Sequence, residues 1–302
     1  MARSKRIPTT IVGTGKLARS LAPLLDRAGY PIAAIVGRTR RAAVAVCDST
    51  RRAHPTTSPR VGAERGLLIL IAVSDRAIET VARKLAAARG IDWSERTVMH
   101  HAGALGPEPL ARLAAAGATV GVMHPLQSLG TPRLAREILP GSRARVEGDR
   151  AGAAAARRLA RALELVPLDF PELSEEDRTA YHAAASLLSN DLLALLTIAT
   201  ELLEAAGLER DRALAALLPL ARGTLRQLEA EGLGGALTGP AARGDVETLR
   251  RHLERLRARS PQDAEAHRLL SLRLARLALE LGESSAARTR RALGGRSRGA
   301  EV

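Results

Sequence analysis

The sequence predicts a doubly wound α/β domain followed by a mainly α-helical domain. In the first half, short apolar runs alternate with amphipathic stretches, which is the pattern of βαβ units that build a mostly parallel sheet. After Phe170 the strand-like runs stop and only helical patterns follow. The chain has 302 residues, which suits two domains better than one core. We therefore expect an α/β domain over residues 1–170, a helical domain over 171–282 and a basic, disordered tail over 283–302.

The strands of the first domain are predicted from short runs of aliphatic and β-branched residues. The segment 54–66 is rich in Pro, Thr and Gly and gives the weakest strand pattern. The expected strands are 10–12, 32–36, 67–73, 97–100 and 118–123, with 143–147 and 165–168 extending the sheet.

Amphipathic stretches between these strands predict the helices of the first domain. Gly29, Gly90 and Gly117 follow three of them, at the position where a left-handed residue commonly ends a helix. The expected helices are 16–28, 40–53, 76–89, 108–116 and 152–164, with Asp75 as the cap of the third.

The helical domain is predicted to begin at Ser174. A serine caps free backbone N–H groups and the acids 175–177 suit a helix N-terminus, so a long helix is expected from here to Gly207. The later helices are 211–231 (bent or broken at Pro219), 245–257 and 261–281, the last capped by Ser260 and Pro261.

Composition narrows the class of protein. The net charge of +14 comes almost wholly from arginine, and four scattered aromatic residues do not provide the stacking surface of a single-strand binder. One cysteine, Cys47, allows neither a disulfide framework nor a cysteine-based zinc site, and we expect no bound metal. The longest strand-like apolar run is much shorter than a membrane span, and no signal-peptide pattern follows the basic start. These features predict a soluble cytoplasmic protein with no membrane and no specific nucleic-acid partner.

The stretch "IVGTGKLA", residues 11–18, matches the G-x-G-x-x-G/A pattern of dinucleotide-binding domains. Gly13 permits a tight turn out of the strand, Gly15 lets the backbone approach a pyrophosphate, and Ala18 lets helix and strand pack closely. The pyrophosphate is expected at the N-terminus of helix 16–28, where N–H groups and the helix dipole favour an anion. The predicted cofactor contacts of this turn are Gly13, Thr14, Gly15, Lys16, Leu17 and Ala18.

The end of the second strand favours NADP over NAD. An NAD site usually carries Asp or Glu there, whereas this chain reads "IVGRTRR" and supplies Arg38 and Thr39. A guanidinium group suits a 2′-phosphate, and no carboxylate is present to repel it. The alternative is that these are ordinary surface arginines in an arginine-rich chain.

Other strand ends supply polar residues at the same edge of the predicted sheet. In doubly wound folds ligands bind outside the carboxyl ends of the strands. Val73 and Ser74, then His101 and Gly103 in "HHAGALG", are therefore predicted to line the cofactor. His124 in "HPLQSLG" is expected near a nicotinamide ring, while His100 is expected to belong still to its strand.

Four motifs in this order resemble a known family. "IVGTGKLA", "HPLQSL", "YHAAASLLSND" and "ALTGPAARGD" are similar to proteins with a Rossmann-like domain followed by the domain of unknown function 2520. Such proteins are usually grouped with NADP-dependent reductases of the ketopantoate and pyrroline-5-carboxylate reductase kind. The resemblance implies the fold and the cofactor, and leaves the substrate open. The His-Pro pair also looks like a motif of prephenate dehydrogenases, by analogy only.

The long helix offers candidates for proton transfer. At helical spacing His182, Ser186, Ser189 and Asn190 share one face of an otherwise apolar helix. Ketopantoate reductases and hydroxyacid dehydrogenases carry Lys and Asn on the corresponding helix, and this chain has no lysine there. We therefore expect His182 to donate the proton, with Asn190, Ser186 and His124 contacting the substrate. The alternative is a polar stripe that serves a helix or dimer contact.

The loop "LTGPAARGD" is the second candidate. Thr238 and Arg243 could hold a substrate carboxylate, since Arg offers a bidentate fork, while Asp245 is expected to cap the next helix. The alternative is a well-made turn. The sequence thus predicts an NADP-dependent oxidoreductase for a small carbonyl, imine or hydroxy acid, dimeric through the helical domain and with its site between the domains. A nucleotide-binding sensor or regulatory protein without turnover is the second hypothesis.

Overall fold

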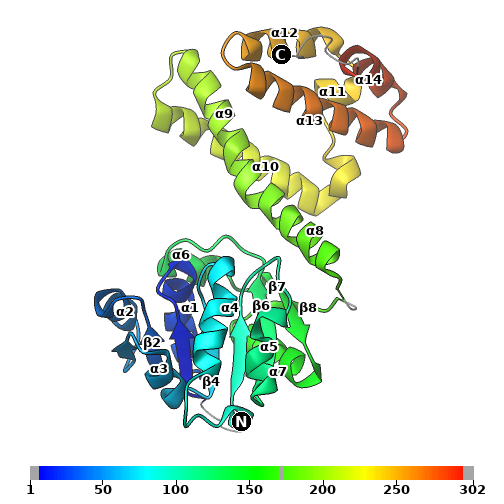
Figure 1. Cartoon of the computed structure of the whole chain (residues 1–302). Helices are drawn as coiled ribbons and strands as arrows, with labels where there is room; N and C mark the ends of the chain where they lie inside the picture. The colour runs from blue at the N-terminus through cyan, green and yellow to red at the C-terminus, as the bar shows by residue number, and fades with distance from the viewer. Residues whose placement is uncertain (1–6, 171–172, 295–302) are drawn as a thin grey trace, which may run out of the picture. The chain divides into compact units, whose positions relative to one another are not determined.

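The computed structural model describes residues 7–170 and 173–294, and the chain divides into two compact units, residues 1–189 and 190–302 (Figure 1). The boundary lies later than the predicted 170 because helix α8 (Glu175–Ser186) packs on the first unit through side chains such as Tyr181 and Arg178. The last eight residues of the predicted tail lie outside the described residues.

The described part of the first unit contains one sheet of eight strands in the order β3-β2-β1-β4-β5-β6-β7-β8. All neighbouring strands are parallel except β6 and β7. The carboxyl ends of β1, β4, β5 and β6 therefore meet at one edge. The strands are β1 (Thr9–Val12), β2 (Ile32–Val36), β3 (His54–Thr56), β4 (Leu68–Ile71), β5 (Thr97–His100), β6 (Thr119–Pro125), β7 (Arg143–Gly148) and β8 (Val166–Leu168).

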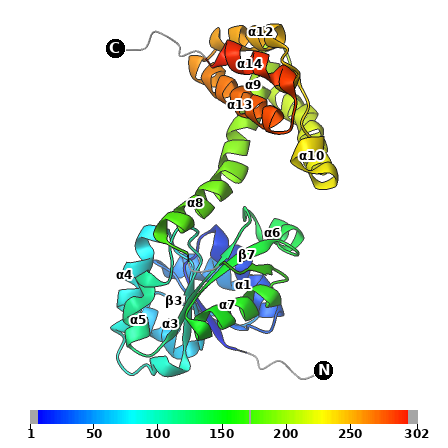
Figure 2. The same ribbon diagram turned by 90° about the vertical axis from the view of Figure 1, so that its right-hand side faces the viewer.

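Helices cover both faces of this sheet, as Figure 2 shows. Alternate strand residues point to opposite faces, so Ile11 packs in one core and Val12 in the other. The first core holds α1 (Lys16–Arg27), α2 (Arg40–Cys47), α6 (Pro132–Ile138) and α7 (Arg150–Ala162). The second holds α3 (Pro59–Arg65), α4 (Asp75–Ala86), α5 (Ala111–Ala115) and the 3₁₀ turns Trp93–Glu95 and Glu108–Leu110.

This architecture confirms the predicted doubly wound domain, with local corrections. The segment 54–66, which has the weakest strand pattern, contains β3 and then α3. Ser58 caps α3 by accepting a hydrogen bond from the Val61 amide. Helix α2 ends at Cys47, earlier than predicted, and α6, capped by Thr131, was not predicted. Ser74, rather than Asp75, is the N-cap of α4, and Asp75 lies in its first turn.

The second unit is helical. Its cores bring α9 and α12 together through Ile198 and Leu253, and α11 and α13 through Ala242 and Ala275. Its helices are α9 (Leu192–Ala205), α10 (Arg210–Gly235), α11 (Pro240–Arg243), α12 (Val246–Arg257), α13 (Pro261–Glu280) and α14 (Ala287–Leu293), with a 3₁₀ turn at Ser284–Ala286.

Three expectations for the helical half need correction. Helix α10 passes through Pro219 and is interrupted instead at Gly232, whose φ is 68°. The predicted disordered tail is helical over 284–293, because Thr289 and Leu293 are buried against the second unit. A π-helical turn, Leu187–Asp191, separates α8 from α9.

Long apolar side chains on α9 and α10 remain exposed. Leu193 is 66% exposed, Leu220 69% and Leu233 65%. By length and composition alone, the helical stretch 175–205 is apolar enough to cross a membrane, and only 6% of its most apolar window is buried.

Candidate active site

The turn from β1 to α1 has the geometry that the glycine pattern requires. Gly13 has a φ of 135°, and a Cβ there would collide with the carbonyl group of Ala72 at the end of β4. Gly15 is the N-cap of α1, no side chain caps that first turn, and a Cβ at Gly15 would meet nothing within 4 Å. Ala18 is fully buried. The structure thus leaves free backbone N–H groups beside open space at a helix N-terminus, which suits an anion.

The end of β2 places Arg38 at the surface, next to this turn in the sheet order. The Thr39 hydroxyl accepts a hydrogen bond from the Ala42 amide and caps α2 at 3.2 Å, so its first role is structural. Arg40 donates to the Pro55 carbonyl. Among these residues Arg38 is therefore the guanidinium best placed to meet a ligand at this edge.

The ends of β4 and β5 place only some of the predicted residues at an open surface. Ser74 is exposed and its hydroxyl caps nothing. His101, in contrast, is only 6% exposed, and its Nδ1 lies 2.5 Å from the Met123 carbonyl. Its Nε2 is buried without a hydrogen-bond partner among the described residues, and the predicted cofactor contact of His101 stays a prediction. His100 ends β5 as expected, with Nε2 2.7 Å from the Gly106 carbonyl.

Strand β6 and helix α8 bring His124, Tyr181 and His182 together at this edge. His124 Nδ1 lies 2.9 Å from the Tyr181 hydroxyl, and the ring centroids of His124 and His182 are 6.2 Å apart. Both imidazoles face Gly103, where a Cβ would lie 3.0 Å from His124 Nε2 and would collide with His182 Nδ1. The two histidines therefore share a space that exists because residue 103 has no side chain.

A buried arginine, Arg145, contacts the Tyr181 ring and the loop that carries Gly103. Arg145 in β7 is fully buried, donates to the carbonyls of Ala102 and Leu105, and lies 5.5 Å from the centre of the Tyr181 ring. Its charge is balanced by an ion pair with Glu147, which also binds Arg178 of α8. The network fixes the loop that carries Gly103 and holds α8 against the sheet.

Burial keeps the imidazoles of His101 and His124 uncharged near neutral pH. Desolvation lowers the pKa of His101 from 6.5 to about 4, and desolvation together with Arg145 and His182 lowers the pKa of His124 to about 3. Desolvation raises the pKa of the Tyr181 hydroxyl to about 12. Near neutral pH the cluster thus contains a neutral His124 and a protonated Tyr181.

These pKa values predict that the fold loses stability as the pH falls. The unfolded chain takes up a proton on each imidazole near pH 6.5, whereas folded His101 and His124 stay neutral to about 4 and 3. Because the unfolded state binds more protons between these values, lowering the pH from 7 to 5 should cost about 2 kcal/mol for each histidine. Urea unfolding of the wild type and of His101→Gln at both pH values measures the difference. An equal loss in the two proteins would contradict the prediction.

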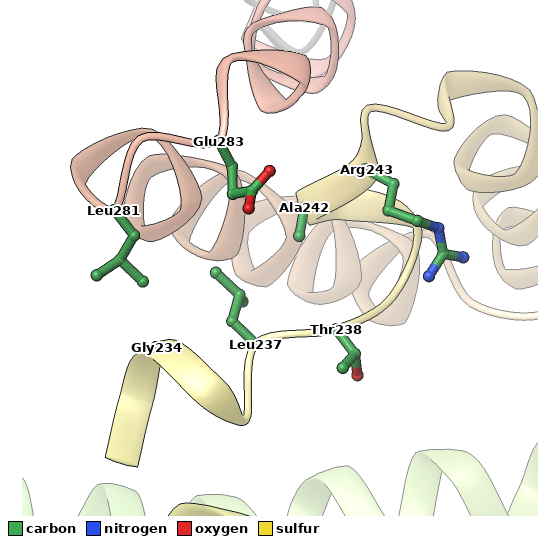
Figure 3. A pocket seen from close by; sticks show the side chains of 7 residues that line it. All are labelled: Gly234, Leu237, Thr238, Ala242, Arg243, Leu281 and Glu283. Atoms are coloured by element: carbon green, nitrogen blue, oxygen red, sulfur yellow. The ribbon is translucent and has the colours of Figure 1, made fainter. Parts of the chain in front are cut away.

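In the second unit, Thr238 and Arg243 line one hollow of about 440 Å³, and their role as substrate contacts stays a prediction. Figure 3 shows Arg243 and Glu283 on either side of Ala242, with Leu237 and Leu281 as the apolar part of the lining. Asp245 caps α12 through the Thr248 amide, as expected. The hollow combines a guanidinium, a carboxylate, a hydroxyl and apolar surface, so Glu283 balances the charge that Arg243 would offer to an anion.

The remaining candidates are separated by the π turn. Ser186 ends α8, one turn beyond His182, whereas Asn190 lies in the π turn and starts the second unit. The helical spacing that placed all four polar residues on one face does not hold across a π turn. Tyr181 and Arg145 were missed as site residues. Tyr181 could have been found as the neighbour of His182, while Arg145 lies in a predicted strand without a signal of its burial.

The chain matches two domain models in succession. Residues 1–125 match a Rossmann-like domain, and residues 142–274 match a domain of unknown function, DUF2520. The two domains follow in the order that the sequence motifs implied, and the resemblance is confirmed. No curated protein sequence matches the chain.

Several solved structures share the fold over nearly the whole chain. BF3122 from Bacteroides fragilis, classed as an NADP oxidoreductase, is 25% identical over 89% of this chain and 97% of its own, with a TM-score of 0.71. A pyrroline carboxylate reductase from Plasmodium falciparum with NADP bound is 12% identical over 94% and 100%, with a TM-score of 0.61. A reductive aminase from Aspergillus terreus with NADPH and ethyl-5-oxohexanoate is 18% identical over 93% and 96%, with a TM-score of 0.61. The predicted cofactor agrees with the NADP and NADPH bound in the last two structures.

Proposed function

We propose that this chain, in which a DUF2520 domain follows a Rossmann-like domain, is an NADP-dependent oxidoreductase for a small carbonyl compound, imine or hydroxy acid. The observation that carries the proposal is the meeting of two features at one sheet edge. The open glycine turn after β1 suits a pyrophosphate, and two imidazoles gather at the ends of β5 and β6. The relatives named as reductases support the same class of reaction.

The chain's own residues fit the nucleotide. The first-turn N–H groups of α1 and the bare backbone at Gly15 would hold the pyrophosphate. Arg38 would pair with the 2′-phosphate. When bound, NADPH supplies a hydride at its nicotinamide ring.

The imidazoles then complete the reaction. His182 is exposed on α8 and is the group we assign as proton donor to the substrate oxygen or nitrogen. Its proton balances the hydride, so that the double bond becomes an alcohol or amine and the nucleotide is released oxidised. His124 and Ser186 are assigned to contact the substrate from β6 and α8. Asn190, Thr238 and Arg243 lie in the second unit and keep their predicted roles as substrate contacts, and the proposal does not rest on them.

The cofactor assignment is tested by calorimetric titration of the full chain with NADPH and NADH. Replacing Arg38 with alanine should weaken NADPH binding about ten- to a hundredfold and leave NADH binding unchanged, because only NADPH carries the 2′-phosphate. Arg112→Ala, an exposed arginine of α5 on the other face of the sheet, is the matched control. Failure of the wild type to bind either nucleotide would refute the assignment.

A nucleotide-binding sensor without turnover is the second candidate. Helix α8 carries no lysine. The resemblance to ketopantoate reductases and hydroxyacid dehydrogenases would imply one on this helix. NADPH binding is expected under both hypotheses, so the role of His182 separates them.

We also propose that the chain is a soluble cytoplasmic homodimer, paired through the second unit. The support is the exposure of Leu193 on α9 and of Leu220 and Leu233 on α10, side chains that favour burial against a second apolar surface. A second copy presents the same surface and can bury it symmetrically.

Light scattering of the full chain at micromolar concentration is expected to give twice the mass of a single chain. The double substitution Leu193→Glu and Leu220→Glu should give the monomer mass, because it places four charges in the interface of each dimer. Arg222→Glu, an exposed change on α10 without apolar loss, is the control. A monomeric wild type, or recovery of the chain in the membrane fraction of cells, would contradict the proposal.

A further inference from the structure

The hydrogen bond between His124 and Tyr181 fixes more than the position of the two rings. Phe170 packs edge-on against Tyr181 with ring centroids 5.8 Å apart, and the Arg145 guanidinium lies 5.5 Å from the centre of the phenol ring. His124 meets the ring at 81° between planes. Tyr181 is thus held in place, and its hydroxyl is aimed at His124 Nδ1 at 2.9 Å.

The direction of this bond follows from the available acceptors. In the part of the chain that the structure describes, His124 Nδ1 is the recorded partner of the Tyr181 hydroxyl. If Nδ1 carried the proton, the half-buried phenol would keep an O–H without an acceptor, which is unfavourable. The phenol therefore donates to Nδ1. Both groups are uncharged near neutral pH, because burial raises the pKa of Tyr181 to about 12 and lowers that of His124 to about 3.

A neutral imidazole with Nδ1 accepting must carry its proton on Nε2. That atom faces Gly103, where it would lie 3.0 Å from a Cβ. His124 therefore presents an uncharged N–H donor to the space between the two histidines. Arg145, although paired with Glu147, also disfavours a positive charge on His124.

We propose that Tyr181 is a positioning residue that locks His124 as a neutral hydrogen-bond donor, and that this donor selects an aldehyde or ketone over an iminium ion. The proposal rests on the proposed function for its reaction. A carbonyl oxygen accepts from Nε2–H, and the interaction strengthens as negative charge develops on that oxygen. An iminium nitrogen has no lone pair with which to accept that hydrogen bond.

The lock is tested without substrate or cofactor. The full chain, labelled with ¹⁵N-histidine, is studied by long-range ¹H–¹⁵N correlation near neutral pH, with His124 assigned from the spectrum of His124→Gln. We expect His124 as the Nε2–H tautomer in the wild type and a mixture of tautomers in Tyr181→Phe. Tyr30→Phe, the other tyrosine of the chain, should leave the tautomer unchanged. An Nδ1–H tautomer in the wild type, or no change in Tyr181→Phe, would overturn the role of Tyr181.

The selectivity is tested by NADPH oxidation with small ketones and aldehydes and with N-methyl-1-pyrrolinium, which is permanently cationic. Cyclopentanone matches this cation in ring size. The carbonyl compounds should be favoured in kcat/KM by about tenfold or more, and Tyr181→Phe should reduce this ratio through kcat while the Kd of NADPH stays constant. Preference for the cation would overturn the selectivity. Oxidation with neither class would overturn the proposed function together with the selectivity, and the tautomer would still decide the role of Tyr181.

Discussion

Replacing Gly13 with alanine is expected to abolish NADPH binding and to lower the free energy of unfolding by about 2–6 kcal/mol. At a φ of 135° an L-residue is strained, and its Cβ would run into the carbonyl of Ala72. Strain of about 1–3 kcal/mol and overpacking of about 1–3 kcal/mol then add up. Since domains are stable by only about 5–15 kcal/mol, this loss is visible in urea unfolding.

Two matched glycines separate the causes. Gly29 has a φ of 91° and open space around it. Gly29→Ala should therefore lower the free energy of unfolding through backbone strain alone, and NADPH binding should stay unchanged. Gly15 has an ordinary φ of −74° and open space, so Gly15→Ala should leave stability unchanged. If a pyrophosphate lies against this backbone, the same change should weaken NADPH binding about tenfold or more. Wild-type affinity in Gly15→Ala would mean that the turn serves the fold alone.

The fold could be predicted because its signals are local. Strands 32–36 and 97–100 were predicted with the bounds that β2 and β5 have, since buried parallel strands are continuous apolar runs. Helix α6 was missed because it is short, although Thr131 and Pro132 give it a cap and a first turn. The tail was misjudged for a different reason. Its arginines suggest disorder, but Thr289 and Leu293 are buried by contacts with residues far away in the sequence.

The site could be predicted only in part, because it forms by long-range packing. Two separate motifs predicted His124 and His182 as site residues. Helix α8 brings the two side chains together by packing on the sheet. Arg145 alternates with apolar neighbours in a strand, a pattern that normally points a charge to solvent. It is buried because the carbonyls of Ala102 and Leu105 and the carboxylate of Glu147 satisfy it. No short-range pattern contains that information.

Replacing His182 with alanine is expected to lower kcat about 10²–10⁴-fold on any substrate found by screening, with the Kd of NADPH unchanged. The reason is the division of tasks within the cluster. His124 is held neutral, with burial lowering its pKa to about 3, and Tyr181 has a pKa of about 12, so neither is suited to exchange a proton near pH 7. His182 is exposed on α8 and lies against Gly103, where the substrate oxygen is expected.

The control is His252→Ala, an exposed histidine of α12 in the second unit, which should keep full turnover. Gly103→Ala provides an independent test of the same geometry, because its Cβ would displace His182 without removing a titratable group. Loss of turnover in both His182→Ala and Gly103→Ala, with nucleotide binding intact in His182→Ala, is the result that a proton donor at this place requires. Unchanged turnover in His182→Ala would remove this residue from the chemistry. If no substrate is turned over while NADPH binds tightly, the sensor hypothesis becomes the better account of the chain.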